Sequence, residues 1–184
     1  MKLEEYKKIA MQTEIKSSSY SSKESMYSAC MGLMEETGEV IAELRKPLFK
    51  GNFHQKKLDV EAVKGEIGDL MWYIALICKN TDINMNELRV GQEKIKKDLP
   101  KRERLIQLSI KMGQKSGEIV QEYEKIFCGE SDKCQLKEKI QQQYSCTCEL
   151  LRELGITLDD VLSENVKKIN SRYGDNNKFV LEQE

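Results

Sequence analysis

GLMEETGEVIAEL, residues 32–44, carries four glutamates on a segment whose apolar spacing predicts a helix. Glu36 and Glu39 are three residues apart, so their carboxylates are expected on one face of that helix. Like charges at this spacing repel each other by about 0.2–0.5 kcal/mol per pair. Some partner should therefore compensate for the repulsion, and the candidates are lysines, water or a metal ion.

A second acidic pair lies in GEIGDLMWYIAL, residues 65–76, where Glu66 and Asp69 have the same spacing. The apolar run at 70–78 that follows predicts a buried helix. If the two helices face each other, four carboxylates meet, and without a counter-charge they would take up protons or weaken the fold. Mg²⁺ resolves this conflict because it takes oxygen ligands and leaves room for phosphate oxygens. The competing interpretation is that both pairs are solvated surface charge.

The composition favours an all-α fold. The 184 residues are 39% hydrophobic and 33% charged, with only two prolines, a pattern typical of long helices rather than of a sheet sandwich. Helices are predicted over residues 2–14, 23–45, 58–79 and 84–98, and Pro47 is expected to end the second of them.

Charge and hydropathy exclude several classes of protein. A net charge of −1 makes nucleic acid an unexpected partner. The longest apolar run has nine residues, too few to cross a bilayer, so no membrane association is expected. The first twenty residues lack the apolar region of a signal peptide, and the six cysteines are then best interpreted as reduced thiols. The predicted compartment is the cytoplasm.

Three short segments of the first half recur in order in the second half, at offsets of 79, 78 and 73 residues: GEVIAEL at 38–44 as GEIVQEY at 117–123, LFKG at 48–51 as IFCG at 126–129, and DINMNEL at 82–88 as GITLDDV at 155–161. This order predicts a helical bundle built from two tandem repeats, 1–100 and 101–184, that pack as an intramolecular pseudo-dimer. Such a fused pair can still form a homodimer.

The second repeat has lost most of the acids. In the repeat register, Gln114 and Lys115 replace the first two glutamates of the motif, and only Glu118 keeps its charge. Lys139 and Gln142 replace the second pair. One acid of four cannot hold Mg²⁺, so the second half is predicted to be a non-catalytic copy.

EETGE at 35–39, followed by EIGD at 66–69, resembles the E-E-x-x-E and E-x-x-D pattern of the MazG-like, all-α nucleoside triphosphate pyrophosphohydrolases. This superfamily includes dimeric dUTPases and dCTP pyrophosphatases. Further segments look like family segments in family order: YKKIAMQT at 6–13, KPLFKGN at 46–52 and NVKKINSRYGDNNKF at 165–179.

The resemblance implies the roles of individual residues. The ligands of Mg²⁺, or of Mn²⁺ as a substitute, would be Glu36, Glu39, Glu66 and Asp69. Glu35 would be a further acid of the catalytic set with Glu36 and Glu39, either orienting water or binding a second ion. The residues that approach the phosphates would be Asn165, Lys168, Arg172 and Tyr173. The competing interpretation is that these cations only favour the dipole at a helix end.

The predicted function is Mg²⁺-dependent hydrolysis of a nucleoside triphosphate between its α and β phosphates, giving a monophosphate and pyrophosphate. The clearing of unwanted deoxynucleotides is the expected role. Two alternatives stay open. The protein could be a catalytically idle module that senses a nucleotide or Mg²⁺, or a helical interaction protein whose acidic pairs are only surface charge.

Overall fold

The computed structural model describes residues 1–14, 21–49, 57–91, 95 and 98–173. Within these ranges there are six α-helices and no strand, which confirms the predicted all-α fold. The elements in chain order are α1 Leu3–Ala10, the 3₁₀ helix η1 Met11–Thr13, α2 Ser22–Leu48, α3 Val60–Asn80, the 3₁₀ helix η2 Met85–Glu87, α4 Lys101–Phe127, α5 Lys133–Leu154 and α6 Leu158–Tyr173.

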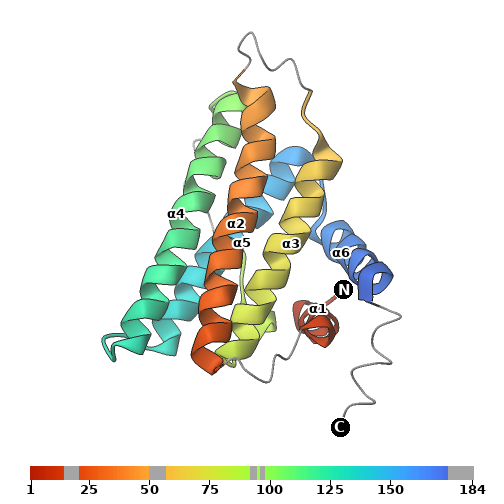
Figure 1. Cartoon of the computed structure of the whole chain (residues 1–184). Coiled ribbons are helices and arrows are strands. Elements are labelled where there is room, and N and C mark those ends of the chain that lie inside the picture. The colour runs from red at the N-terminus through yellow and green to blue at the C-terminus, as the bar shows by residue number, and fades with distance from the viewer. Residues whose placement is uncertain (15–20, 50–56, 92–94, 96–97, 174–184) are drawn as a thin grey trace.

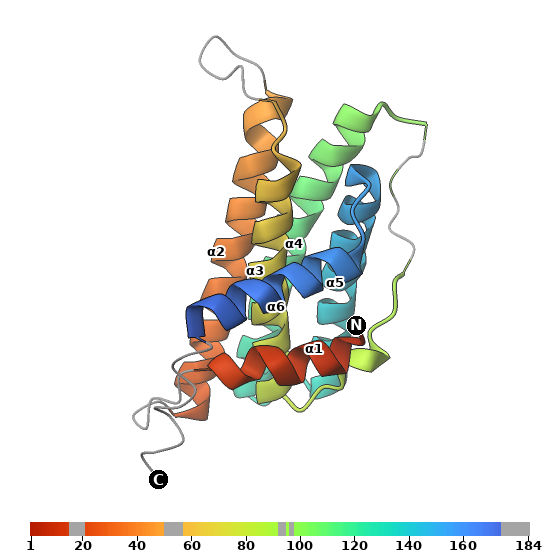
Figure 2. The same cartoon turned by 90° about the vertical axis from the view of Figure 1, so that its right-hand side faces the viewer.

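Four long helices form a bundle, and the two short ones lie across it. α2 packs on α3, α4 packs on α5, and α2 also packs on α4 (Figure 1). Figure 2 shows α1 and α6 side by side across the bundle, where both contact α3. Side chains of α3 such as Leu70, Ile74 and Ile77 are fully buried, and each contributes about 1.5–3 kcal/mol to the free energy of unfolding. α3 is therefore the central element on which the site is built.

The helix ends follow local capping rules. Ser21 and Glu24 form a capping box at the start of α2, and Asp59 accepts the backbone N–H of Ala62 at the start of α3. α5 ends at Gly155, whose φ of 75° is the left-handed conformation that glycine adopts without strain.

The prediction that Pro47 ends the second helix is wrong. α2 runs to Leu48 with Pro47 inside its last turn, and the backbone N–H of Phe49 still donates to the carbonyl of Arg45 at 3.1 Å. Proline removes one hydrogen bond of the helix. In the last turn of a 27-residue helix that packs on both α3 and α4, this local loss does not decide where the helix ends.

The predicted helix over residues 84–98 is also wrong. Its described part holds only the three-residue η2, after which Leu88 is extended. Asn84 caps η2 by accepting the backbone N–H of Asn86 at 3.0 Å. The carboxylate of Glu4 accepts the N–H of Met85 at 2.9 Å. Side chains thus satisfy backbone N–H groups that a helix would otherwise pair. The segment therefore does not become helical, although its spacing of apolar residues predicts a helix.

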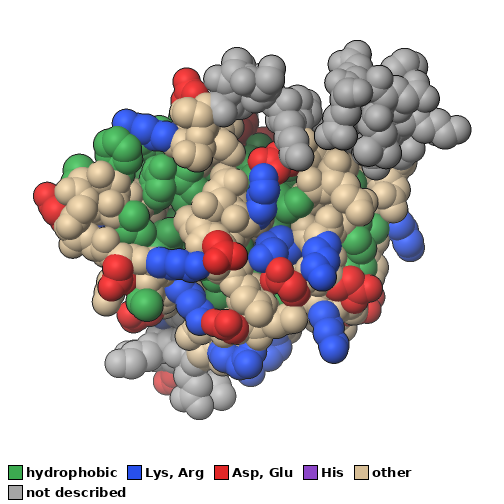
Figure 3. Space-filling model, turned by 90° about the horizontal axis from the view of Figure 1, so that it is seen from below, with side chains coloured by type: hydrophobic (Ala, Val, Ile, Leu, Met, Phe, Trp, Pro, Cys, Tyr) green, Lys and Arg blue, Asp and Glu red, His purple; other side chains and the backbone are tan. Residues whose placement is uncertain are grey.

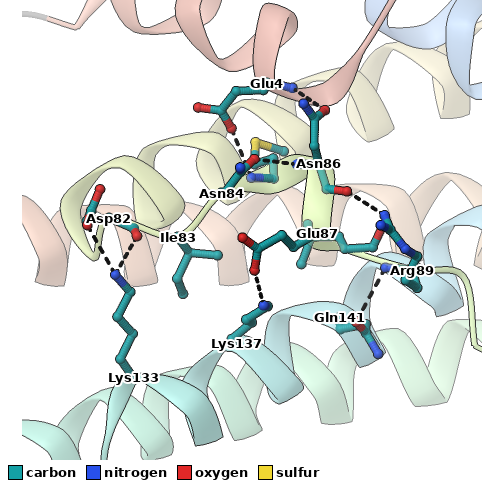
Figure 4. A network of polar contacts seen from close by, with 12 residues as sticks. Glu4, Asp82, Ile83, Asn84, Asn86, Glu87, Arg89, Lys133, Lys137 and Gln141 are labelled. Atoms are coloured by element: carbon teal, nitrogen blue, oxygen red, sulfur yellow. Dashed lines mark hydrogen bonds and ion pairs between the residues drawn. The ribbon is translucent and has the colours of Figure 1, made fainter.

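We call residues 82–91 the crossover segment. Figure 4 shows three residues of α5 in contact with it: Lys133 with Asp82, Lys137 with Glu87, and Gln141 with Arg89. Gln141 accepts the N–H of Arg89 at 3.3 Å, and Ser145 accepts the N–H of Gly91 at 2.8 Å. The α5 side chains that make these contacts or pair with acids of the segment recur every four residues, on one face of the helix: Lys133, Lys137, Gln141 and Ser145. This one-sided pattern fixes the path of the crossover segment along α5.

No helix in the described ranges is long and apolar enough to span a membrane. Figure 3 views the end of the bundle that carries the start of α2 and the α4–α5 turn, and it shows acidic and basic side chains interspersed there. Nucleic-acid backbones are bound through a field of positive charge, and the mixed charges on the described part of this face do not supply one.

Gly68 lets α6 approach α3 closely. A Cβ at this position would lie 3.0 Å from Nδ2 and 3.1 Å from Cβ of Asn165. At Gly65, one turn earlier on α3, a Cβ would meet nothing within 4 Å. The two glycines therefore share a helix but differ in what an added methyl group would touch.

We expect Gly68→Ala to lower the free energy of unfolding, because overpacking costs about 1–3 kcal/mol. The matched control Gly65→Ala should raise it by up to about 1 kcal/mol, since alanine favours a helix interior over glycine. Urea unfolding of both variants measures the difference. Equal stability of the two would contradict the close packing of α6 on α3.

Candidate functional site

Three carboxylates converge between α2 and α3. Glu36 and Glu39 lie on one face of α2, as their spacing predicts, and Glu66 reaches them from α3. One oxygen of each lies within 4.8 Å of the other two. Glu36 and Glu66 are half-buried and Glu39 is exposed. We call these three residues the acidic cluster.

The electrostatics of the acidic cluster are unfavourable without a counter-ion. Burial, together with the charges of the neighbouring acids, Asp69 foremost, raises the pKa of Glu36 to about 7. Burial also raises the pKa of Glu66, as do its hydrogen bond and charge interaction with Glu39. Both shifts mean that the site resists holding its full negative charge.

The acidic cluster fits a hard divalent cation. Its donors are carboxylate oxygens on two helices, and Mg²⁺ and Mn²⁺ prefer such oxygens. A cation bound among them would remove the repulsion that raises the two pKa values. Three carboxylates would also leave coordination positions for water or phosphate oxygens.

Asp69, the fourth predicted ligand, is engaged by α6. Its Oδ1 accepts a hydrogen bond from Nδ2 of Asn165 at 3.0 Å, and its Oδ2 forms an ion pair with Lys168. Asp69 remains close enough to Glu36 and Glu66 to raise the pKa of both. The structure thus brings three of the four predicted ligands together and places the fourth beside them, bound to two of the predicted phosphate contacts.

A pocket of about 350 Å³ opens next to the acidic cluster. Its lining combines charged residues of α2, α3 and α6 with apolar and hydroxyl side chains: Thr13, Glu14, Ser25, Ser28, Glu36, Asp69, Trp72, Tyr73, Leu76, Lys168, Ile169 and Arg172. Carboxylates and cations meet at one part of the lining, and aromatic rings cover another. A pocket of this size and make-up suits a small ligand with a charged group and a flat apolar group.

Trp72 forms a fixed wall of the pocket. Its indole N–H lies 3.2 Å from the carbonyl of Ala10 and 3.3 Å from the hydroxyl of Thr13. Its ring packs edge-on against Tyr73, with 5.0 Å between centroids. Tyr73 in turn lies over Gly32, where a Cβ would come within 2.1 Å of the Tyr73 ring. The wall depends on contacts among α1, α2 and α3.

The other predicted residues are placed as follows. Arg172 is exposed on α6 and lines the pocket. Glu35 is exposed on α2 and lines a neighbouring depression with Met31 and Tyr73, outside the acidic cluster. The side chain of Tyr173 lies outside the described part of the chain.

Sequence reasoning missed one participant. Tyr6 of α1 is fully buried, and its hydroxyl lies 2.8 Å from Oδ1 of Asn165, the residue that contacts Asp69. In the sequence Tyr6 is one apolar position of an amphipathic helix, and nothing in its spacing distinguishes it from a packing residue.

The second hairpin places opposite charges at the positions predicted to be equivalent to the acidic cluster. Nζ of Lys115 lies 3.0 Å from the carboxylate of Glu118, and Nζ of Lys139, from α5, lies 3.4 Å from it. Burial opposes the charge of Glu118, but hydrogen bonds and charges of both lysines lower its pKa below the ordinary value. This group is neutralised by the chain itself.

Comparison with known families supports the interpretation of the first hairpin. Residues 24–102 match the model of the MazG nucleotide pyrophosphohydrolase domain. The match includes α2, α3 and the crossover segment, and so all four predicted metal ligands, and it ends at the start of α4. Searches of curated proteins and of solved structures give no match for this chain.

The raised pKa of Glu36 predicts how stability depends on pH. The folded protein takes up a proton at Glu36 near pH 7, above the ordinary value of 4.5, so its stability should fall as pH rises from about 5 to 7. In EDTA at pH 8, Glu36→Gln should therefore melt higher than the wild type. Mg²⁺ should raise the melting temperature of the wild type and have a much smaller effect on the variant.

Glu118→Gln is the matched control, because the pKa of Glu118 is lowered and its charge is stabilising. Its melting temperature at pH 8 should fall below that of the wild type. If the wild type melts at a higher temperature than Glu36→Gln in EDTA at pH 8, the charge of Glu36 does not destabilise the acidic cluster as predicted.

Proposed function

We propose that this protein is a Mg²⁺-dependent pyrophosphohydrolase that cleaves nucleoside triphosphates to monophosphates and pyrophosphate. One observation carries the proposal. The acidic cluster lies beside a pocket to which α6 contributes Lys168 and Arg172. Carboxylates for a cation, and cations for phosphates, thus meet at one pocket. The family of the domain at residues 24–102 agrees with this chemistry.

The four acids of α2 and α3 would hold the metal: Glu36, Glu39, Glu66 and Asp69. When bound, Mg²⁺ would polarise a phosphoryl oxygen and lower the pKa of a bound water. A carboxylate of α2 accepts the proton of the attacking water, with Glu35 either orienting that water or binding a second ion. This mechanism requires no covalent nucleophile.

α6 supplies the positive charge that the substrate needs. A triphosphate brings close to four negative charges, and one Mg²⁺ among four carboxylates has no surplus to hold them. Lys168 already reaches the site through its ion pair with Asp69, and Arg172 lines the same pocket one turn later. We assign these two residues, with Tyr173, to phosphate binding. The fourth predicted contact, Asn165, is 4% exposed, does not line the pocket and holds Asp69 instead.

We further propose that α4 and α5 are a degenerate copy of α2 and α3. The hydroxyls of Thr37 and Ser116, 79 residues apart, lie 2.7 Å from each other across α2 and α4. This distance in sequence equals the predicted repeat offset, as expected where a pseudo-twofold axis passes between equivalent positions. The pairing of Glu118 with two lysines supports a copy that binds no metal.

A panel of ribonucleoside and deoxyribonucleoside triphosphates with Mg²⁺, scored for pyrophosphate and monophosphate, tests the proposed activity. With the best substrate, Glu39→Gln should lose nearly all turnover, because it removes a ligand charge from the metal. Its repeat-related control, Glu118→Gln, should retain turnover. An equal loss in both would contradict the assignment of the metal to the first hairpin.

If no triphosphate is hydrolysed but nucleotide with Mg²⁺ raises the melting temperature, the protein is the idle sensor instead. If the protein neither hydrolyses a triphosphate nor gains thermal stability from nucleotide with Mg²⁺, the helical interaction protein is the remaining function. These outcomes separate the three functions that the sequence alone left open.

Lys168→Ala and Arg172→Ala should each reduce kcat/KM about ten- to hundredfold, because losing one charge-assisted contact to phosphate costs about 1.5–3 kcal/mol. Lys167→Ala is the matched control, since Lys167 has the same charge on the same helix but is exposed and does not line the pocket. Kinetics are measured together with melting temperatures. Unchanged kcat/KM in both test variants would remove α6 from phosphate binding.

A further inference from the structure

We infer that Tyr6 is a positioning residue of the metal site: its hydroxyl orients the amide of Asn165, and that amide holds Asp69 beside the acidic cluster. The inference rests on the proposed function for the role of Asp69. Three helices that are distant in sequence meet in this chain of contacts, α1 through Tyr6, α6 through Asn165 and α3 through Asp69.

The direction of the hydrogen bonds allows only one arrangement. An ionised Asp69 accepts hydrogen bonds and cannot donate, so Asn165 must present its NH₂ group to it, at 3.0 Å. The amide oxygen of Asn165 then faces Tyr6, whose hydroxyl must donate, at 2.8 Å. Burial and the charge of Asp69 both raise the pKa of Tyr6, so the phenol keeps the proton that it donates. Each bond thus determines the polarity of the next.

Packing leaves this chain of contacts little freedom. Tyr6 is fully buried and Asn165 is 4% exposed. Asn165 lies directly over Gly68, the residue before Asp69, where an added Cβ would approach within 3.0 Å. The hydroxyl of Tyr6 also lies 3.4 Å from the carbonyl of Gly68. The phenol oxygen therefore touches both sides of the contact between α3 and α6.

Loss of the Tyr6 hydroxyl oxygen alone should weaken metal binding. Without the Tyr6 donor, the buried oxygen of the Asn165 amide loses its hydrogen bond, and an unsatisfied buried acceptor is costly. The side chain would shift to relieve this cost and weaken its hydrogen bond to Asp69. Asp69 would then keep Lys168 as its stronger partner and would be drawn toward it. Groups that orient a metal ligand from behind typically change metal affinity ten- to hundredfold.

Tyr6→Phe tests the inference because it keeps the ring and removes only the oxygen. Mn²⁺ is titrated calorimetrically into the metal-free protein without nucleotide, and melting temperatures are recorded in EDTA. We expect the Kd for Mn²⁺ to rise about tenfold or more in Tyr6→Phe. The control Tyr144→Phe removes another buried hydroxyl, one that pairs with Cys148 of α5. It should lose comparable thermal stability with an unchanged Kd.

A second variant shows whether Tyr6 acts through Asn165. In Asn165→Ala the Kd should rise as well, and adding Tyr6→Phe should change it no further, because the intermediary is already gone. If the increases in Kd of the two single variants multiply in the double variant, Tyr6 acts independently of Asn165, and its role is one of packing. A wild-type Kd in Tyr6→Phe, or no Mn²⁺ binding by the wild type, would overturn the inference.

The titration also separates this inference from the proposed function. A wild type that binds Mn²⁺ more tightly than Tyr6→Phe, yet hydrolyses no triphosphate, would leave the positioning role intact and overturn the pyrophosphohydrolase. Hydrolysis of a triphosphate by the wild type, together with an unchanged Kd for Mn²⁺ in Tyr6→Phe, would support the pyrophosphohydrolase and overturn the positioning role.

Discussion

Three carboxylates that converge on the seam between α2 and α3 repel one another, and the closing of this hairpin depends on how their charge is balanced. Part of the balance comes from the helices that lie across the bundle. α6 brings Lys168 and Asn165 to Asp69, at the edge of the acidic cluster, and α1 supports α6 from behind through Tyr6. The fully buried apolar side chains of α3 supply the free energy that holds these charges in place.

The two hairpins balance their charge in different ways. In α4 and α5 the cation is an ammonium group on the chain, since Lys115 and Lys139 both reach Glu118. Such a cation is always present, and it has no coordination positions at which a ligand could bind. The carboxylates of the first hairpin are compatible with an exchangeable divalent ion, which would leave coordination positions for other oxygens. Under the proposed function, catalysis would take place at the first hairpin, and the second hairpin would only support it.

The parts of the structure that depend on local spacing were predictable, and the parts that depend on distant partners were not. Glu36 and Glu39 share a face of α2 because any helix places residues three apart together. The end of α2 at Pro47 and the helix over 84–98 were predicted wrongly, because contacts with other helices outweighed local preference. The partners of Asp69 lie 96 and 99 residues away, and the orientation of an amide leaves no trace in residue spacing.

The separation of Asp69 from Lys168 also bears on biosynthesis. A ribosome makes the residues of α2 and α3 well before those of α6, 99 residues later in the case of this ion pair. Because synthesis proceeds from the amino terminus, α2 and α3 can come together while α6 is still unmade. During that interval the two helices have neither the Asp69–Lys168 pair nor the side of the pocket that α6 lines. If the proposed function holds, a nascent chain would lack the cations of α6 that hold a triphosphate until that helix is made and docks.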